Sequence, residues 1–284
     1  MSALPVLLPA AERLALAAER QRALGAAPLR LEASHGLMLL GLFVVGCGIA
    51  QAQVGVDKPS VLDTLVKWTP VLAKGFVFNL AISFLAMAIG TVAGFFLGAA
   101  RISSMAPVRG GAWFTINFFR NAPWLVLLFY CMLLLPFQVR VFGTTIPIPD
   151  WTKATLGLAL PVMANVAEIV RGAIQSIPTT QWEAAHSLAF NRRQTFWMII
   201  IPQCVKRMLP PWMNLYAILT MSTVLVSIVG VNDMMTQTQR VLSAESRPEL
   251  LLAFYSYALL WFFAYCYPIA RWTVRLEARY AVRQ

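Results

Sequence analysis

The sequence predicts an all-α polytopic membrane protein with six transmembrane helices. Two observations support this class. Of the 284 residues, 59% are hydrophobic and 12% are charged, about half the charged share of an ordinary soluble domain. Apolar runs of about 18 residues or more recur along the chain, and each can cross a bilayer core about 30 Å thick. Because no long polar insertion separates these runs, we expect one membrane domain.

Residues 1–34 precede the first apolar run. Their stretch "PAAERLALAAERQRALG" predicts either a short helix that ends near Gly25 on a membrane or partner surface, or a loosely ordered tail. The first basic residue, Arg13, follows a short apolar stretch instead of preceding it. We therefore expect no cleavable signal peptide.

Six apolar runs define the predicted spans, over residues 36–55, 74–100, 113–142, 155–175, 208–231 and 250–271. In the second span, Gly90, Gly94 and Gly98 recur every four residues. Residues at that spacing line one face of a helix, where small residues let a neighbouring backbone approach closely. We expect helix packing from them, and a hinge or a place on a transport pathway is the alternative.

The start of the third run, "GAWFTINFFRNAP", allows two interpretations. In the first, residues 112–120 form a short interfacial helix, and Asn121 caps a span that begins near Pro123. In the second, Arg120 is a buried functional residue. The first keeps the aromatic side chains at headgroup level.

The distribution of basic residues predicts the orientation. Seven of the 23 Lys and Arg residues fall on one side of the predicted spans: Lys58, Lys67, Lys74, Arg140, Lys153, Arg240 and Arg247. The other 16 fall on the opposite side, which should be cytoplasmic. Both termini then lie inside. The basic residues that give the net charge of +11 lie in short loops and tails between the apolar runs. We therefore expect the chain to contact a lipid bilayer and no nucleic acid.

Metal or catalytic clusters are not apparent in the sequence. The four cysteines form no CxxC pair, and three lie inside apolar runs, where cysteine behaves as a small core residue. His35 and His186 have no cluster of acids or cysteines near them. We expect no metal site and no catalytic residue.

Residues 178–207 form a basic, partly polar segment between the fourth and fifth spans. Thr180 and Glu183 have the spacing of a capping box, which predicts a helix starting at Gln181. It should break near Phe190–Asn191, and a second helix should follow. Its small apolar face would be made of Ala184, Ala185 and Leu188. Such a helix suits contact with a soluble partner, and a structured loop without a partner is the alternative.

This segment resembles the EAA loop of ABC importer permeases. The matching residues are Glu183, Ala184, Ala185, Ala189, Ile201 and Pro202. Four surrounding motifs resemble those of the polar amino-acid permeases: "FFRNAPWLVLLFY", "ANVAEIVRGAIQSIPTTQWEAA", "MLPPWMN" and "STVLVSIVGVNDMM". They occur in the family's order and cover about residues 70–270.

The resemblance implies a multi-subunit importer of the bacterial inner membrane. Its permeases pair with an identical or homologous second permease, two ATP-binding subunits and a periplasmic amino-acid-binding protein. The residues of this chain that would dock on the ATPase are Thr180, Glu183, Ala184, Ala185, His186, Leu188 and Ala189. Since the chain contains no GxxxxGK[ST], ATP and Mg²⁺ should bind the partner subunits. We therefore expect neither an enzyme nor a cofactor here.

The resemblance also divides the chain. Residues 71–272 would be the five-span permease domain, and 35–70 an additional N-terminal span with a periplasmic segment. The tails would be 1–34 and 273–284. Two departures stand out: Ala189 replaces the family's glycine, and Met221 with Ser222 replace its Lys and Asp or Asn. The cargo, a polar amino acid or a derivative such as an opine, therefore stays open.

Glu168 is the one acidic residue clearly within a predicted span, about 12 Å from the span's end near residue 176. Asn165 shares its helix face. Such a carboxylate is costly and usually functional, so we expect it to meet the ammonium group of an amino acid, with Thr223 and Ser227 adding hydroxyl contacts. In the alternative, Glu168 pairs with Arg171 and holds two helices together.

Two other function classes fit the sequence less well. An ion-coupled secondary transporter should show several intramembrane acids and an inverted repeat, and neither is evident. A membrane enzyme should show a catalytic cluster, which is also missing.

Overall fold

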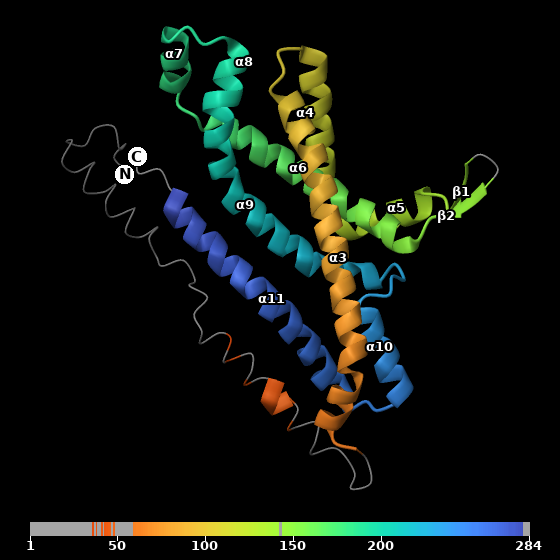
Figure 1. The fold of residues 1–284 in the computed structure, drawn as a ribbon. Coiled ribbons are helices and arrows are strands. Elements are labelled where there is room, and N and C mark those ends of the chain that lie inside the picture. Colours follow the sequence, from red (N-terminus) through yellow and green to blue (C-terminus); the bar gives the residue numbers. More distant parts are fainter. Residues whose placement is uncertain are drawn as a thin grey trace, which may run out of the picture. The chain divides into compact units, whose positions relative to one another are not determined.

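The computed structural model describes residues 59–141 and 144–280, with scattered positions from Gly36 to Gly48 (Figure 1). The chain divides into the units Met1–Gly41 and Leu42–Gln284, and the fold below belongs to the second. The predicted helix or tail in 1–34 and most of the predicted span 36–55 lie outside the described residues.

Helices build most of the described chain. In order, the elements are α3 (Val61–Arg101), α4 (Ala106–Asn121), α5 (Trp124–Leu134), β1 (Gln138–Val141), β2 (Thr144–Pro147), α6 (Asp150–Gln175), α7 (Thr179–Ser187), α8 (Arg192–Gln194), the π-helix η2 (Thr195–Ile200), α9 (Ile201–Ser222), the 3₁₀ helix η3 (Thr223–Ser227), α10 (Met234–Glu245) and α11 (Leu250–Tyr280). Within the described ranges, four helical stretches are long and apolar enough to cross a membrane, or five if the bent pair α4–α5 counts as one. This agrees with an all-α membrane protein.

Helix α3 starts 13 residues before the predicted span 74–100. Ser60 caps it, because its hydroxyl accepts a hydrogen bond from the Asp63 amide. At 41 residues it is about 60 Å long, twice the thickness of a bilayer core. Lys67 and Lys74 marked the edge of the apolar run, but they do not end the helix.

The third predicted run, 113–142, is divided into two helices, and the break near Pro123 that the first interpretation expected is present. Helices α4 and α5 meet at 106° around Ala122 and Pro123, and a hairpin follows. Pro123 interrupts the helix because it lacks an amide donor. Asn121 does not cap α5; its side-chain amide donates to the Asn117 carbonyl. The hairpin pairs β1 and β2 antiparallel, with Gln138 opposite Pro147, and supplies the only strands in the described ranges.

The later helices match three predicted spans with different ends. Helix α6 contains the predicted 155–175 and begins at Asp150. The predicted 208–231 corresponds to a continuous helical stretch from Arg192 to Ser227 that changes from α to π to α to 3₁₀ winding. Helix α11 contains 250–271 and continues to Tyr280. Helix α10, polar along one side, was not predicted.

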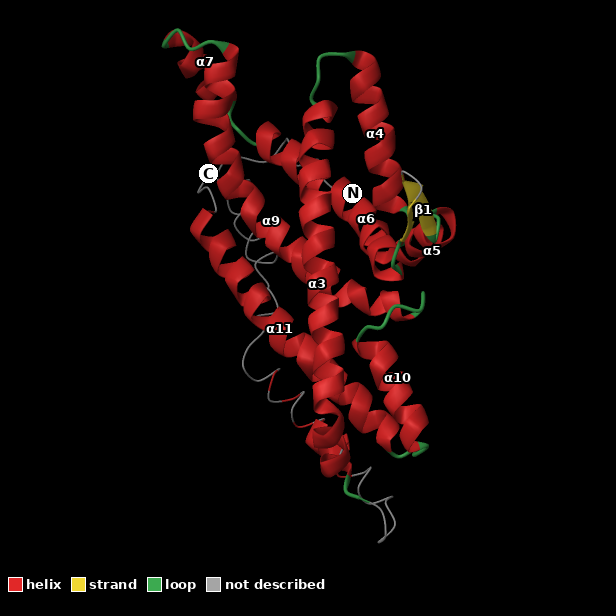
Figure 2. Cartoon of the chain, turned by 45° about the vertical axis from the view of Figure 1, so that its right-hand side comes forward, coloured by secondary structure: helices red, strands yellow, loops and turns green. Residues whose placement is uncertain are grey.

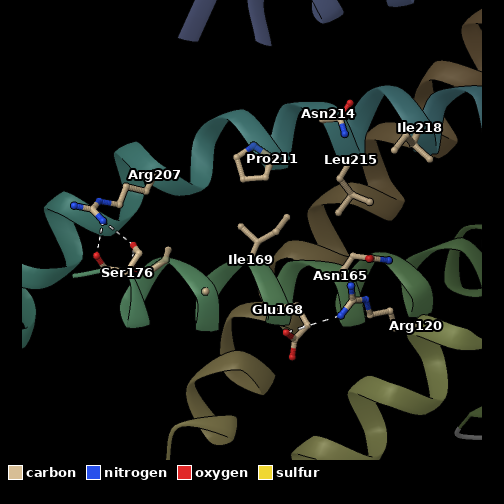
Figure 3. Close-up of a pocket in the computed structure, with 12 residues that line it drawn as sticks. Arg120, Asn165, Glu168, Ile169, Ser176, Arg207, Pro211, Asn214, Leu215 and Ile218 are labelled. Carbon is tan, nitrogen blue, oxygen red and sulfur yellow. Dashed lines mark hydrogen bonds and ion pairs between the residues drawn. The ribbon is translucent and has the colours of Figure 1, made fainter. Parts of the chain in front are cut away.

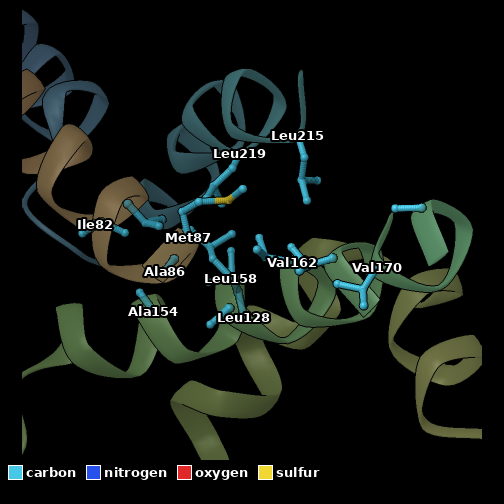
Figure 4. Close-up of a cluster of buried hydrophobic side chains, with 14 of the residues drawn as sticks. Ile82, Ala86, Met87, Leu128, Ala154, Leu158, Val162, Val170, Leu215 and Leu219 are labelled. Atoms are coloured by element: carbon cyan, nitrogen blue, oxygen red, sulfur yellow. The ribbon is translucent and has the colours of Figure 1, made fainter. Parts of the chain in front are cut away.

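The main core lies where α6 packs against α3, α5 and α9 (Figure 4). Gly90, Gly94 and Gly98 form the α3 side of its tightest contact. A Cβ atom on Gly94 would lie 2.6 Å from the Met163 carbonyl oxygen, and one on Gly98 would lie 2.7 Å from the Ala167 carbonyl oxygen. The structure thus places the three glycines in close packing against α6.

A second core joins α3, α10 and α11. Phe76 of α3 makes edge contacts with Trp261 and Phe262 of α11. A buried polar group of three residues lies beside it: the Asn79 amide donates to Thr223 Oγ1 at 3.0 Å and to Asp233 Oδ2 at 3.2 Å. Asn79 Oδ1 accepts from the Met234 amide, so this side chain joins α3, η3 and the start of α10.

The described unit has two ends. Helix α7 and the start of α4 lie at one end, named here the α7 end, and α10 lies at the other, the α10 end (Figures 1 and 2). At the α10 end, Glu245 accepts hydrogen bonds from the Trp68 indole at 2.7 Å and the Lys67 ammonium at 3.0 Å. These contacts fasten the end of α10 to α3.

Candidate functional site

A cavity of about 580 Å³ opens between α6 and α9 (Figure 3). Its polar lining contains six side chains: Arg120, Asn165, Glu168, Ser176, Arg207 and Asn214. Helix α6 supplies Asn165 and Glu168, its C-cap residue is Ser176, and α9 supplies Arg207 and Asn214. Arg120 reaches in from the last turn of α4, and its guanidinium points toward Glu168 (Figure 3).

Glu168 makes its ionic contacts through one carboxylate oxygen. Arg171 donates to Oε2 from Nε at 3.0 Å and from Nη2 at 2.7 Å. Arg120 Nη1 lies 3.9 Å from the same oxygen. No described residue donates a hydrogen bond to Oε1. The Glu168–Arg171 pair lies within one helix, so of these contacts only the longer one to Arg120 links two helices.

The amide and hydroxyl groups of the lining are only partly engaged. Asn165 lines the cavity, and its Nδ2 donates to the Pro161 carbonyl at 2.8 Å, while its Oδ1 receives no hydrogen bond from a described residue. Arg207 Nη1 donates to Ser176 at both the carbonyl and the hydroxyl oxygen, at 2.6 and 2.8 Å. This bond links α9 to the end of α6.

The structure brings together two of the four predicted substrate-path residues. Asn165 and Glu168 line the cavity, whereas Thr223 and Ser227 are not among its lining residues. Thr223 is fully buried in the polar group with Asn79. Ser227 donates to the Val224 carbonyl within η3. Both hydroxyls donate a hydrogen bond to a backbone carbonyl one turn earlier in the helical stretch, as such groups often do in apolar surroundings.

Four lining residues were not predicted as site residues: Arg120, Ser176, Arg207 and Asn214. For Arg120 the signal was its depth beyond the loop, which had suggested a functional arginine as the second interpretation. Ser176, Arg207 and Asn214 come together because α9 lies along α6. Since Ser176 is about 30 residues or more from the other two in the sequence, the sequence alone does not predict that they meet.

At the α7 end, α7 begins at Thr179 directly after Pro178. The predicted start at Gln181 and the capping box of Thr180 with Glu183 are wrong, because no side chain caps this helix. Proline at the N-cap already sets an extended backbone before the first turn. Of the predicted docking residues, Ala185 is buried, while Thr180, Glu183, Ala184, His186, Leu188 and Ala189 are exposed.

Helix α7 ends in a left-handed turn. Phe190 N–H donates to the Ala185 carbonyl and Ala189 N–H to the His186 carbonyl, which is the Schellman pattern. Ala189 therefore has φ +58°, the conformation that glycine adopts without strain. The predicted break near Phe190–Asn191 is confirmed.

A capping box does occur, at the start of α8. Asn191 Oδ1 accepts from the Gln194 amide, and Gln194 Oε1 accepts from the Asn191 amide. The predicted second helix begins there. A cleft of about 450 Å³ lies between α7 and the α8–η2 segment, lined by Trp182, His186, Arg192, Thr195 and Phe196.

Among the residues that the structure describes, no group of three or more His, Cys, Asp or Glu side chains could hold a metal ion. Cys131, Cys204 and Cys266 are free thiols.

Comparison with known families identifies the class. Residues 90–279 match the family described as "Binding-protein-dependent transport system inner membrane component". The match covers more than half of the chain, and the chain belongs to this family.

Individual similar proteins have more specific descriptions than the family does. A probable amino-acid ABC transporter permease protein of Bacillus subtilis, YckA, is 34% identical over 75% of this chain and 90% of its own length. The glutamate/aspartate import permease protein GltK of Escherichia coli O157:H7 is 33% identical over 60% and 77%. A crystal structure of an amino acid ABC transporter with histidines has a TM-score of 0.67, with 28% identity over 78% of this chain and 99% of that chain.

The protein is accordingly the permease subunit of an amino-acid ABC importer, a multi-pass protein of the inner membrane. ATP hydrolysis resides in separate subunits, and the permease itself is neither an enzyme nor a holder of a cofactor. The interpretations as an ion-coupled secondary transporter and as a membrane enzyme are therefore wrong.

Proposed function

We propose that this permease carries a polar amino acid, or a close derivative such as an opine, through the cavity between α6 and α9. The observation that supports this route is Glu168, a carboxylate that lines a polar cavity and whose contacts with Arg171 and Arg120 all involve Oε2, so that Oε1 has no donor among the described residues. A substrate ammonium group can occupy that position, with Asn165 Oδ1 as a second acceptor. A carboxylate in apolar surroundings is costly and usually functional.

The α7 end is proposed to dock on the ATP-binding subunits, which makes it the cytoplasmic end. Helix α7 projects exposed side chains away from the core, and Leu188 is 71% exposed. Exposed side chains on a helix that stands clear of the core give a soluble partner a surface to contact. The cleft beside Trp182 and Arg192 would receive a side chain of the partner.

The assembly would include a second permease, identical or homologous, and a periplasmic binding protein that meets the α10 end. Six spans are proposed: the four helical stretches, the bent pair and the predicted N-terminal span at 36–55. The basic-residue count supports a cytoplasmic location for both termini.

ATP-dependent uptake into proteoliposomes tests the route. The permease would be reconstituted with its ATP-binding subunits, second permease and binding protein. In Glu168→Gln, which keeps the shape and removes the charge, uptake should fall or change selectivity while assembly and basal ATPase activity persist. Glu277→Gln, on the exposed end of α11, is the matched control and should transport normally. A dissociated complex or unchanged uptake in Glu168→Gln would exclude Glu168 as a substrate ligand.

A further inference from the structure

We infer that the end of α11 binds the headgroup of an anionic phospholipid through three arginines. These residues, Arg271, Arg275 and Arg279, are named here the arginine stripe. They lie outside the cavity between α6 and α9 and after the motifs by which the chain resembles amino-acid permeases. The inference rests on the orientation given under the proposed function, in which the α7 end is cytoplasmic, because anionic lipids give the cytoplasmic leaflet a negative surface potential.

The stripe begins where α11 leaves the hydrocarbon. Helix α11 starts at Leu250 in the core shared with α10 and runs toward the α7 end (Figures 1 and 2). Residues 250–270 contain no charged residue, and at about 1.5 Å per residue they span about 32 Å, the thickness of a bilayer core. Arg271 comes next, and Arg275 and Arg279 follow about 6 and 12 Å further along the axis. The headgroup layer of one leaflet is roughly 5–8 Å thick, so Arg271 and Arg275 lie within it.

The stripe lies on the side of α11 that faces away from the bundle. Residues four apart are displaced by about 40° around a helix, so the three arginines occupy one side of α11. The opposite side carries Cys266 and Thr273, which are 2% and 5% exposed. Arg271 and Arg275 are both exposed. They therefore project to the side of α11 that the other described helices leave open.

Within the described end of α11, no acidic residue shares the side of the stripe. Residues 271–284 contain four arginines and one acid, Glu277, so their formal charge is +3, counted as +4 and −1. Glu277 is two residues from Arg275 and from Arg279, and side chains at that spacing do not face each other on a helix. Arginine keeps its proton at any physiological pH. The stripe is therefore a permanent positive charge that the phosphate of an anionic headgroup can match.

Two aromatic side chains accompany the stripe near headgroup depth. Trp272 is 62% exposed, and tryptophan is enriched at the interface between membrane and water. Tyr267, one turn before Arg271, accepts a hydrogen bond from Arg271 Nη1 at 3.3 Å, and the guanidinium lies 5.8 Å from the centre of the tyrosine ring. This contact holds Arg271 along the helix on the side where Arg275 lies. A guanidinium group can bind a phosphate with two parallel hydrogen bonds, so this side of the helix suits a phosphate ligand.

The depth of the stripe favours a lipid over a soluble subunit. An ATP-binding subunit would meet the permease beyond the headgroups, whereas Arg271 and Arg275 lie among them. Phosphatidylcholine also carries a phosphate, but its choline ammonium offsets the attraction. Phosphatidylglycerol keeps a net negative charge, so each arginine should raise its affinity by about fivefold.

Lipid titration of the purified importer tests the inference. The complex of this chain with its second permease and ATP-binding subunits would be titrated in detergent with phosphatidylglycerol, or with phosphatidylcholine of the same acyl chains. Native mass spectrometry counts the bound lipid. Phosphatidylglycerol should bind at least about fivefold more tightly than phosphatidylcholine, and higher salt should reduce this preference. Inorganic phosphate should not displace the lipid, because it lacks the acyl chains that bury apolar surface.

Variants assign the preference to the stripe. Arg275→Gln should weaken phosphatidylglycerol binding by about fivefold and leave phosphatidylcholine binding unchanged. Arg275→Lys, which keeps the charge, should retain most of the preference. Arg109→Gln is the matched control, because it removes an exposed arginine from α4 at the same end of the described unit, where Arg109 contacts the Ser103 carbonyl. This variant should bind both lipids as the wild type does.

The results that would overturn the inference do not depend on transport. Equal binding of the two lipids, or displacement of phosphatidylglycerol by inorganic phosphate, would exclude a headgroup site. Equal losses in Arg275→Gln and Arg109→Gln would mean that net charge alone attracts the lipid. Release of the ATP-binding subunits from Arg275→Gln with unchanged lipid binding would assign the stripe to that partner. Each of these results leaves the proposed function intact while the wild type takes up amino acids with ATP, whereas absent uptake with preserved lipid binding would refute the proposed function alone.

Discussion

Ala189 is in a conformation that its side chain disfavours. At φ +58° an alanine Cβ approaches the backbone, which costs roughly 1 kcal/mol relative to glycine. In the EAA loop that this segment resembles, the family has glycine at this position. The structure gives the physical reason why that difference matters, since the Schellman turn requires the left-handed residue.

Ala189→Gly should stabilise the turn between α7 and α8 by about 1 kcal/mol. The amides of Ala189 and Phe190, which make the closing hydrogen bonds, should exchange with solvent about fivefold more slowly. Hydrogen exchange measured by mass spectrometry on this segment checks the prediction. Ala184→Gly, within the helix, should have the opposite effect. Equal exchange in both variants would show that Ala189 carries no strain.

Glu245 gives the fold a dependence on pH. Its hydrogen bonds from the Trp68 indole and the Lys67 ammonium hold the pKa of its carboxyl below the ordinary value. Because the folded pKa is depressed, the stabilisation is complete above the pKa of an unfolded glutamate, about 4.3, and is lost as the pH falls through the folded value. Wild-type protein should therefore melt at a higher temperature than Glu245→Gln at neutral pH.

The difference between these two melting temperatures should narrow as the pH falls below about 4.3. Thermal unfolding in detergent across a pH series measures it. Glu277→Gln, exposed on α11, should show no such pH-dependent difference from the wild type. A difference that is constant across the series would mean that the Glu245 charge is not involved.

At the scale of elements, the contact between α3 and α6 depends on the absence of side chains. A Cβ on Gly94 would lie 2.6 Å from a carbonyl oxygen and 2.7 Å from Val166 Cβ, both on α6. Two rigid helices must then separate, so Gly94→Ala should destabilise the fold by about 1–3 kcal/mol. Its melting temperature in detergent should fall.

The matched control is Gly110→Ala on α4, where an added Cβ meets nothing within 4 Å. There alanine should be neutral or stabilising by up to about 1 kcal/mol, because glycine is a poor helix former. If both substitutions had the same effect, the close approach at Gly94 would not be a stabilising feature.

The positions of the helices were predicted from the sequence more accurately than the residues at which they begin and end. Apolar runs report where the chain would lie in lipid, but α3 and α11 continue past those runs because charged residues such as Lys67 and Arg275 are also good helix formers. The bend at Pro123 divided one apolar run into two helices. Helix α10 lacks an apolar run, so only its contacts with α3 and α11 reveal it.

At the scale of the whole molecule, the family was recognisable from sequence, whereas the cavity was only partly so. Each motif is a short run of neighbouring residues, so it can be recognised from the sequence alone. Asn165 and Glu168 share one helix face and were predicted together, but their meeting with Arg207 and Asn214 requires the path of α9. Thr223, which was predicted with them, lies in the buried polar group with Asn79 and not in the cavity lining, and its place on the substrate path stays a prediction.

The proposed orientation makes a prediction about the intact protein. Tags inserted near Lys58 and after Gln284 should report opposite sides of the membrane, with the C-terminal tag cytoplasmic. Labelling of intact cells with an impermeant reagent measures this. A C-terminal tag that reacts from outside would overturn both the orientation and the docking of α7 on a cytoplasmic ATPase.

Asn79 also has a consequence for the order of synthesis. Its partners Thr223 and Asp233 follow it by 144 and 154 residues. At about 5–20 residues per second, a ribosome needs roughly 7 to 30 s to make them. Until then α3 holds an amide whose hydrogen bonds are missing, at a cost of several kcal/mol in hydrocarbon. Helix α3 is therefore made well before the groups that complete the hydrogen bonds of its Asn79 side chain.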